Sequence, residues 1–473
     1  MRGGDDRNPA IESKIPVPTD SSDGLRRSKR LASSTNIYDI PKELLVEILC
    51  RLPCAKSVYR CKSVSKSWGS LTSDSYFVGR LLWLQRDNQT LIPGTIINQL
   101  GDELLTTDLF ATFRRFFEFE HKKGRLIVLL ATWNDLVLCE DISLGEYYIY
   151  NPRTMQLVNL PPIHQCRCIW GCRPAVGFIC EPYYKEEEDR LADNSDQKEE
   201  EERKVIKIDA EYKCKVVRIL HPDDKEKLCF EFKIQVFSSE IGEWRESLVS
   251  CPRGFIYSGI YSRLVSRFGF ASNGMLYWNA TDGDLLGLGP LMINKKSTTT
   301  CSSTTANGDS GYQFHVIKLV RQELEDEDLL SSLYYLQVHH GRLQLVQTVE
   351  NEDPSGVRLS VWELKKEELE QMAVQGGGEL GQKHRKTYNL MDQVYYHELT
   401  SLEYMGSDPN DLDTCFVSLT DYHHDREPVT YKCNIHTGEW SEMETTFTGL
   451  ALQVMFPWWP TPVPTISVCS HTE

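Results

Sequence analysis

Residues 39–77 read DIPKELLVEILCRLPCAKSVYRCKSVSKSWGSLTSDSYF. Pro41 suits the first turn of a helix, where its missing N–H leaves no hydrogen bond unmade, and Glu43 complements the positive helix end. The apolar residues that follow are spaced at i, i+1, i+4, i+5 and i+8, which gives a helix one apolar face. They are Leu44, Leu45, Ile48, Leu49 and Leu52. Pro53 then ends the helix.

Two further short helices are predicted after Pro53. Residues 56–64 form the first, and Ser65 can cap the second through its side-chain oxygen. Their inward side chains are expected to be Val58, Cys61, Val64, Trp68 and Leu71. A module of roughly 40 residues buries too little surface to shield so many aliphatic side chains. Part of the apolar face therefore needs a partner, and each Leu or Ile buried there contributes roughly 1.5–3 kcal/mol before ordering costs are subtracted.

This segment resembles the F-box, the motif that docks on the Skp-type adaptor of cullin–RING ubiquitin ligases. The positions that match the F-box pattern are Pro41, Glu43-Leu44-Leu45, Glu47-Ile48-Leu49, Arg51-Leu52-Pro53, Lys56-Ser57, Arg60, Val64, Lys66, Trp68 and Phe77. Three positions depart mildly from it, since Ile40 and Val58 each replace a Leu and Ser65 replaces a Cys. The alternative is a helical hairpin that packs on this chain's own downstream domain.

The resemblance implies which side chains touch the adaptor. On the first helix these are Ile40, Pro41, Leu44, Leu45, Ile48, Leu49, Leu52 and Pro53. Val58, Val64 and Trp68 are expected to serve mainly the helical core, with some contact at the edge of the interface. Through the adaptor, the resemblance implies cullin and RING subunits as further partners.

Beyond about Asp102 the sequence consists of short apolar or aromatic runs separated by Gly, Asn, Pro and charged clusters. Apolar and polar residues alternate clearly over 230–236 (FEFKIQV), and period two is the signal of a strand. Three hairpins end a strand in a polar turn and start the next with a large side chain, which is Leu157, Trp244 or Trp440. Many short strands of this kind predict a mainly antiparallel all-β domain. A β-propeller of roughly six or seven blades at ~50 residues each is favoured, and a two-sheet β-sandwich with long insertions is the alternative.

The start of this β region resembles plant F-box-associated domains, which are similar to kelch-type or degenerate β-propellers. The resemblance rests on 136–139 (LVLC), 147–154 (YYIYNPRT) and 160–162 (LPP). Leu157 stands where that family has Trp, and the resemblance fades after about Trp278. It implies that the β domain captures a target protein.

Composition divides the chain into five segments. They are a disordered tail over 1–36, the F-box over 37–80, a linker over 81–105, the β domain over 106–460 and a tail over 461–473. Flexible insertions are expected inside the β domain near 185–204, 295–310 and 366–386. The first is acidic, the second is rich in Ser and Thr, and the third begins like a charged helix. The expected fold class is therefore α+β multidomain, with a short three-helix module ahead of the β domain.

Charge and hydropathy argue against several classes of function. The 473 residues carry 52 Lys and Arg against 68 Asp and Glu, a net charge of −16, whereas nucleic-acid binding needs a basic surface. No apolar run approaches the ~20 residues that span a bilayer, and the first residues do not resemble a signal peptide. We therefore expect an intracellular protein, in the nucleus or the cytoplasm, with its 15 cysteines reduced. The basic cluster Arg26–Arg30 is either a nuclear import signal or a solvated tail.

No catalytic, cofactor or metal site is predicted. The glycines at 376, 378 and 381 match a dinucleotide fingerprint formally, but they follow an acidic helical stretch and not a strand. Ser63 and Lys66 have the spacing of a Ser–Lys nucleophile, yet both lie within the F-box match. Two groups contain metal-ligand side chains without paired zinc-knuckle spacing. They are His164, Cys166, Cys168, Cys172 and Cys180, and Asp421, His423, His424 and Asp425.

The function predicted from the sequence is substrate recognition within an SCF-type (cullin–RING) E3 ubiquitin ligase. In this reading the chain is not an enzyme, its F-box docks on the Skp-type adaptor, and its β domain holds an unidentified target protein. The aromatic segment 457–460 (PWWP) is expected to close the propeller or to contact that target. Two alternatives stay open, a non-degradative scaffold that binds the adaptor and a propeller-based metal-dependent enzyme.

Overall fold

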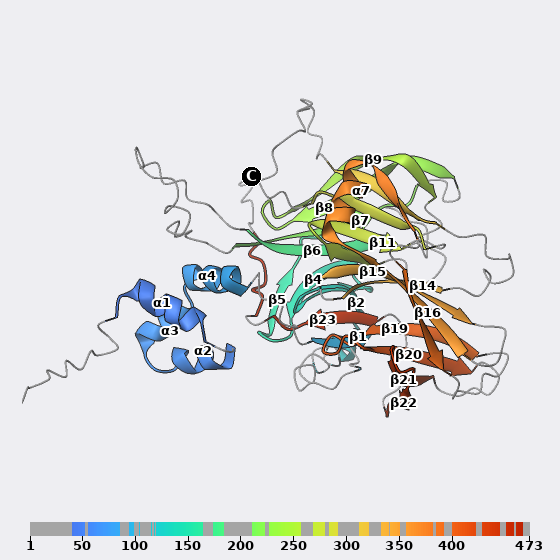
Figure 1. Ribbon diagram of the computed structural model, residues 1–473. Coiled ribbons are helices and arrows are strands. Elements are labelled where there is room, and N and C mark those ends of the chain that lie inside the picture. Colours follow the sequence, from blue (N-terminus) through green and yellow to red (C-terminus); the bar gives the residue numbers. More distant parts are fainter. Residues whose placement is uncertain are drawn as a thin grey trace, which may run out of the picture.

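A computed structural model of the chain contains a small helical module beside a larger β domain (Figure 1). The structure describes residues 40–52, 55–85, 94–98, 104, 115, 118, 120–163, 174–183, 211–222, 227–256, 268–279, 283–291, 312–320, 333–339, 341–350, 356–381, 385–391, 400–421, 428–444, 451–457 and 460–466. The predicted tail over 1–36, with Arg26–Arg30, and the insertions near 185–204 and 295–310 lie outside these residues.

The helical module has four helices where the sequence predicted three. They are α1 (Lys42–Cys50), α2 (Ala55–Lys62), α3 (Lys66–Thr72) and α4 (Ser75–Gln85). Ser65 caps α3 as expected, because its Oγ accepts a 3.2 Å hydrogen bond from the Trp68 amide. The added helix α4 crosses the predicted boundary at residue 80 and supplies Phe77 and Leu81, both fully buried, to the core of the module.

The β domain is a series of antiparallel sheets. Sheet one is β2 (Ile127–Trp133), β3 (Leu136–Asp141), β4 (Glu146–Asn151) and β5 (Gln156–Asn159). Sheet two is β6 (Ala175–Tyr183), β7 (Glu211–Ile219), β8 (Leu228–Ser238) and β9 (Glu243–Ile256). Sheet three is β10 (Phe268–Ser272), β11 (Met275–Asn279), β12 (Leu285–Gly289) and β13 (Gln313–Leu319).

The remaining sheets complete the domain. Sheet four is β14 (Leu333–His339), β15 (Arg342–Glu350), β16 (Gly356–Leu364) and β18 (Arg385–Met391). Sheet five is β19 (Thr400–Ser407), β20 (Thr414–Asp421), β21 (Val429–Asn434) and β22 (Trp440–Glu442). Sheet six pairs β1 (Gly94–Asn98) with β23 (Ala451–Met455).

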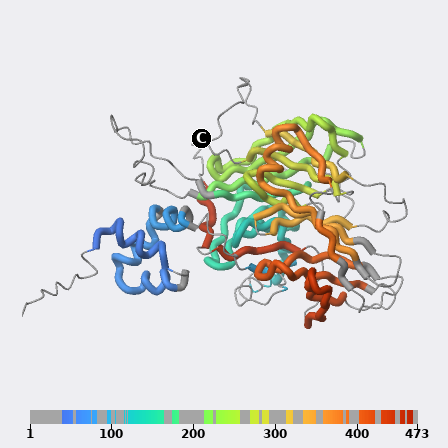
Figure 2. Tube along the Cα trace, in the orientation of Figure 1, coloured from blue at the N-terminus to red at the C-terminus, as the bar shows by residue number. Residues whose placement is uncertain are grey.

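The first strands of sheets one to five contact one another in sequence order, and β23 contacts both β19 and β2. The chain therefore returns to where the β domain began, so that its last strand lies beside the first sheet (Figure 2). Hydrophobic clusters fill the spaces between successive sheets, for example where Phe232 of sheet two meets Phe314 of sheet three at 5.5 Å between ring centroids. This closed series of face-packed sheets is a propeller-like arrangement, as predicted, and does not fit a two-sheet sandwich.

One joint in the ring is unusual, because sheets two and three are hydrogen-bonded to each other. Strand β10 pairs in parallel with β6, and Gly177 lies opposite Gly269 in that pairing. A Cβ on either glycine would come within 2.8 Å of Trp278, so the absent side chains leave room for this fully buried indole. The result is a continuous nine-stranded sheet among the described strands.

Three predicted boundaries were wrong. Residues 94–98, assigned to the linker, form β1, and Asn410 holds its start through hydrogen bonds to the Gly94 amide and carbonyl at 3.0 and 2.9 Å. The segment 366–386 begins with the expected charged helix, which is α7 (Lys366–Val374) with Leu369 buried, but it is no flexible insertion, since β17 (Gly377–Leu380) follows and pairs in parallel with β13. The predicted tail begins with Thr461, which is buried against sheet one.

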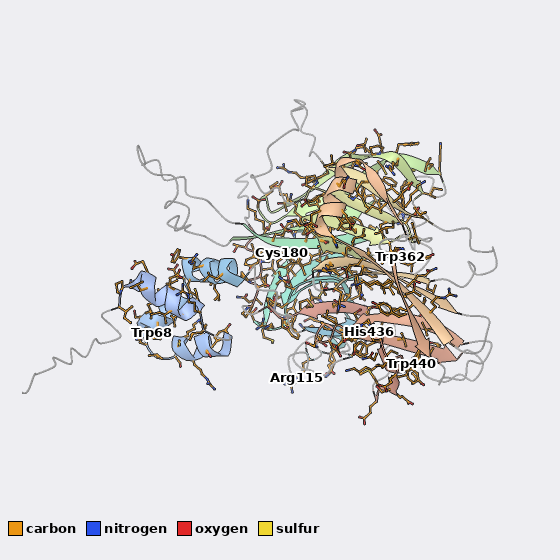
Figure 3. The ribbon with its side chains drawn as sticks, in the orientation of Figure 1. Trp68, Arg115, Cys180, Trp362, His436 and Trp440 are labelled. Atoms are coloured by element: carbon orange, nitrogen blue, oxygen red, sulfur yellow. The ribbon has the colours of Figure 1, made fainter. Side chains whose placement is uncertain are left out.

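The large side chains that open three hairpins have different environments. Trp244 packs against Phe237 and Tyr147, and its Nε1 donates a 2.9 Å hydrogen bond to the Pro161 carbonyl. Trp440 packs on Tyr431 in sheet five (Figure 3). Leu157 is exposed, so the position where the related domains have Trp does not enter the core here.

A buried histidine makes the stability of the β domain depend on pH. His315 on β13 packs edge-on against Tyr277, and burial lowers its pKa to about 4 from the ordinary 6.5. Between these values the unfolded chain binds a proton more readily than the folded one. The free energy of unfolding therefore falls as the pH drops from about 6.5 towards 4, by up to about 3 kcal/mol.

We predict that His315→Gln flattens this pH dependence, because Gln stays neutral throughout the range. Urea unfolding of the full chain at a series of pH values measures it. His121→Gln, at an exposed position, is the matched control and should keep the slope. An unchanged slope in the His315→Gln variant would contradict the assignment.

Candidate functional site on the helical module

Helix α1 presents apolar side chains to two different surroundings. Leu45 and Leu49 are 7% and 2% exposed and pack into the core of the helical module. Leu44 and Ile48 are 57% and 51% exposed. Residues four apart lie one above the other on a helix, so Leu44 and Ile48 form one outward apolar strip.

The packing of α4 explains this division. A salt bridge joins Glu47 of α1 to Arg80 of α4, with 2.5 Å between Oε1 and Nε, and the Cys50 thiol lies 3.9 Å from the Phe77 carbonyl oxygen. Burial raises the pKa of Cys50 to about 12, so it stays a neutral thiol at this contact. Because α4 seals one side of α1, the strip of Leu44 and Ile48 on the other side is left to solvent.

The residues predicted to bind the adaptor fall into three groups. Those exposed are Pro41, Leu44, Ile48 and Val64; those half-buried are Ile40 and Leu52; those buried are Leu45, Leu49, Val58 and Trp68. Trp68 lies inside the helical module (Figure 3). Pro53 lies outside the described residues.

Three of these positions differ from the expectation in a physically clear way. Leu45 and Leu49 were expected at the interface, but a stripe at i, i+1, i+4, i+5 and i+8 is wide enough for α4 to cover one edge of it. Val64 was expected in the core and is 58% exposed, because it lies in the turn between α2 and α3. Among the residues predicted to bind the adaptor, the exposed ones therefore lie along one edge of the apolar stripe and in this turn.

Tyr59 is an exposed apolar residue that the sequence analysis did not single out. It lies on α2, within electrostatic reach of Arg153 and Asp135 of the β domain, and burial raises its pKa. This places α2 towards sheet one. Leu44 and Ile48 stay exposed in the whole chain, which argues against the alternative that the apolar face packs on the downstream domain.

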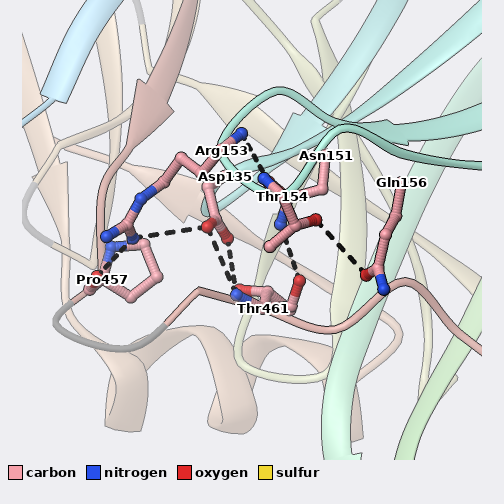
Figure 4. Close-up of polar contacts among 7 residues, drawn as sticks. All are labelled: Asp135, Asn151, Arg153, Thr154, Gln156, Pro457 and Thr461. Atoms are coloured by element: carbon pink, nitrogen blue, oxygen red, sulfur yellow. Dashed lines mark hydrogen bonds and ion pairs between the residues drawn. The ribbon is translucent and has the colours of Figure 1, made fainter. Parts of the chain in front are cut away.

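The motif Asn151-Pro152-Arg153-Thr154 has a structural role in the β domain. Asn151 Nδ2 donates to the Thr461 carbonyl at 2.6 Å, and Arg153 donates to the Pro457 carbonyl at 2.6 Å (Figure 4). Asp135 accepts the Thr461 amide at 3.1 Å and pairs with Arg153 at 3.4 Å. Burial raises the pKa of Asp135, while these bonds lower it. The C-terminal segment is thereby fixed to sheet one, whereas Trp458 and Trp459 of the 457–460 segment lie outside the described residues.

A second exposed apolar surface lies on the β domain. Its members are exposed residues of the β8–β9 hairpin: Leu228 is the register partner of Ile256, Phe230 lies with Leu228 at Gly254, and Leu248 lies farther along β9. Gly254 lies beneath this surface, because a Cβ there would come within 2.9 Å of Leu228 and Phe230. We call these four residues the β8–β9 patch.

The remaining candidate sites do not form chemical constellations among the described residues. No group of three His, Cys, Asp or Glu side chains in the described part of the chain could hold a metal ion. Cys180 is buried within β6, whereas His164, Cys166, Cys168, Cys172, His423, His424 and Asp425 lie outside the described residues. The glycines of the formal dinucleotide fingerprint belong to the turn and strand of β17. No described helix is long and apolar enough to cross a bilayer.

Comparison with known proteins agrees with the geometry of the helical module. A family model described as F-box-like matches residues 37–81. Three relatives from Arabidopsis thaliana are an F-box protein (33% identical, over 26% of this chain and 32% of the relative), a putative F-box/kelch-repeat protein (26%, over 51% and 52%) and a putative F-box protein (48%, over 29% and 36%). The chain thus spans about half or less of the length of these relatives.

A solved prolyl endopeptidase structure aligns with a TM-score of 0.20 at 8% identity, over 88% of this chain and 39% of that one, a likeness too low to carry an argument. The family model and the three Arabidopsis relatives agree in pointing to an F-box. Residues 37–81 therefore match an F-box-like domain, and the β domain that follows them has the propeller-like arrangement described above.

The two environments of α1 predict that truncating a buried side chain destabilises the helical module far more than truncating an exposed one. Leu49→Ala should destabilise the helical module by about 2–5 kcal/mol, because it opens a cavity in a closed core. Ile48→Ala should change its stability by less than about 0.5 kcal/mol, because that side chain is in solvent. Hydrogen exchange of the α1–α4 amides in the full chain measures both, and equal losses of protection would contradict the assignment.

Proposed function

We propose that this protein is the substrate-recognition subunit of an SCF-type (cullin–RING) E3 ubiquitin ligase. In this proposal the F-box-like domain binds a Skp-type adaptor, and the β domain captures a target protein. The main support is the outward strip of Leu44 and Ile48 on a helix whose opposite side is already sealed by α4. The match of residues 37–81 to the F-box-like family supports the nature of the partner.

The energetics of the strip fit binding by a groove on another protein. Isolated exposed apolar residues are ordinary on protein surfaces, but two large aliphatic side chains one turn apart form the anchors of a helix-in-groove interface. Burying them would contribute roughly 1.5–3 kcal/mol each. Pro41, which is exposed just ahead of α1, and the half-buried Ile40 and Leu52 extend the surface along the helix.

The proposed mechanism is proximity, and the chain itself supplies no reacting group. An adaptor held at α1 and a target held on the β domain would become parts of one assembly, which raises the effective concentration of target lysines near the ubiquitin-carrying subunit. Cullin and RING subunits would join through the adaptor. We extend the proposal to an intracellular location, in the nucleus or the cytoplasm.

An apolar candidate for target capture on the described surface of the β domain is the β8–β9 patch. It lies on the last two strands of sheet two and is separate from the helical module (Figure 1). The alternative of a non-degradative scaffold shares the adaptor interface and differs only in the absence of ubiquitin transfer to the bound target. A metal-dependent enzyme has no supporting observation among the described residues.

We predict that the double variant Leu44→Asp, Ile48→Asp loses binding to a purified Skp-type adaptor. Two carboxylates would have to be desolvated in the interface without partners, so we expect a loss in affinity of at least about 100-fold. Isothermal titration with full-length protein measures it, and the circular dichroism of the variant should be unchanged because both side chains are exposed.

The matched control is Leu228→Asp, Phe230→Asp, which places the same charges on the other apolar surface. It should retain full affinity for the adaptor. If the Leu44, Ile48 variant still binds as the wild type does, or if both variants lose binding equally, the adaptor assignment is wrong.

The same pair of variants tests target capture. We expect Leu228→Asp, Phe230→Asp to reduce recovery of ubiquitinated target from a reconstituted ligase while adaptor binding stays intact. Quantitative mass spectrometry of proteins that accumulate under proteasome inhibition identifies the target. Unchanged recovery would remove the β8–β9 patch from the proposal, and stable target binding without any ubiquitin transfer would favour the scaffold.

A further inference from the structure

Two pairs of cysteines lie directly opposite each other on neighbouring antiparallel strands. Cys415 of β20 is the register partner of Cys433 of β21, and Cys180 of β6 is the register partner of Cys214 of β7. All four are buried free thiols. Opposed residues in such a ladder have Cα atoms about 4.5–5.5 Å apart, which lies within the range that a disulfide spans.

The side chains of the two pairs are directed differently. Cys433 Sγ lies 3.9 Å from the Tyr431 carbonyl oxygen, and the neighbouring Cys415 thiol raises the pKa of Cys433. The Cys214 thiol instead bonds to Ser239, whose Oγ also accepts the Cys214 amide at 3.0 Å. In the second pair the Ser239 hydroxyl therefore competes for Cys214, whereas Cys433 has the Cys415 thiol beside it on the neighbouring strand.

The first pair sits at a place where a covalent link would matter. Strands β20 and β21 are the middle strands of sheet five, and the outer strand β22 has only three residues. Phe416, next to Cys415, packs with Ile96 of β1 in the cluster beside sheet six. A bond between β20 and β21 would fasten the sheet against which the closing strands pack.

We propose that Cys415 and Cys433 form a disulfide when the protein meets hydrogen peroxide. One sulfur attacks the peroxide and becomes a sulfenic acid, which releases one water. The other thiol condenses with it, which forms the S–S bond and releases a second water. Two thiols and one hydrogen peroxide thus give one disulfide and two waters, with the sulfurs oxidised and the peroxide reduced.

The rate of this reaction is set by access to the sulfur atoms. The neighbouring Cys415 thiol and burial raise the pKa of Cys433, so the reactive thiolate is scarce in the closed sheet. Oxidation therefore follows local opening at the short β22 edge, where Trp440 lies on Tyr431. The disulfide forms slowly and then holds the two strands together.

Peptide mapping of the full-length protein tests the proposal. Reduced protein is treated with hydrogen peroxide under native conditions, its remaining thiols are alkylated in denaturant, and it is digested without reductant. We expect a peptide pair that joins Cys415 to Cys433 and is lighter by two hydrogen atoms than the free peptides, with loss of alkylation at both. Cys180 and Cys214 should stay alkylated. Full alkylation of Cys415 and Cys433, or linkage only after unfolding, would overturn the proposal.

Two further measurements separate this link from random oxidation. Cys433→Ser should abolish the linked peptide, and Cys180→Ser, the matched change in the other pair, should leave it at the wild-type yield. The oxidised wild type should unfold at a higher temperature than the reduced protein, and a dithiol reductant should reverse the shift. The contrary outcome in the Cys433→Ser variant is a link from Cys415 to another cysteine. If that linked peptide forms in the same yield as the wild-type link, the specific pairing of Cys415 with Cys433 is overturned. None of these readouts involves the adaptor, so they stand apart from the proposed ligase function.

Discussion

The closure of the ring by β1 and β23 is the constraint on which the β domain depends. These strands come from the two ends of the domain, yet they are paired over five residues, and Ile96, Ile97, Leu452 and Val454 are all buried by that pairing. Side chains reinforce the joint. Gln337 of sheet four donates to Tyr404 and Ser407 of sheet five, and Gln453 of β23 donates to the Ser407 carbonyl at 2.9 Å. Thr132 of sheet one then donates to the Gln453 carbonyl at 2.6 Å. Sheets four, five, six and one are thus joined by one run of polar contacts.

The helical module has two kinds of apolar surface, one buried in its own core and one left exposed on α1. A core made by four helices accounts for Leu45, Leu49, Val58 and Trp68, so these residues are occupied within the chain. What is left over on α1 is a narrow strip that no described part of the β domain covers. The module can therefore be stable by itself and still keep an apolar edge for another protein. This is possible because α4 covers the other side of the apolar face of α1.

The sequence predicted the order of the modules and their classes, because periodicity and turn chemistry are local signals. It placed helices over 42–72 and strands throughout the β domain, and the F-box pattern predicted the nature of the first module. It did not predict β1, because this short run of five residues becomes a strand only through pairing with β23, more than 350 residues away. It also read α7 and β17 as an insertion, since the glycines at 376–378 suggest a loop until β13 is available as a partner. The division of α1 into buried and exposed sides needed α4, whose own apolar residues gave no hint of which side they would cover.

The parallel joint between β6 and β10 gives the ring an uneven stiffness. Sheets two and three share backbone hydrogen bonds between β6 and β10, and the buried Trp278 packs against the paired glycines of these strands. This part of the ring therefore moves as one continuous sheet. The sheets on the opposite arc meet mainly through side chains, with a few main-chain bonds such as that from the Met455 amide to the Asn134 carbonyl at 3.0 Å, and such contacts yield more readily than a continuous backbone ladder. Strain imposed from outside would accordingly be taken up on that arc, where β1 pairs with β23, while the sheet shared by β6 and β10 keeps its shape.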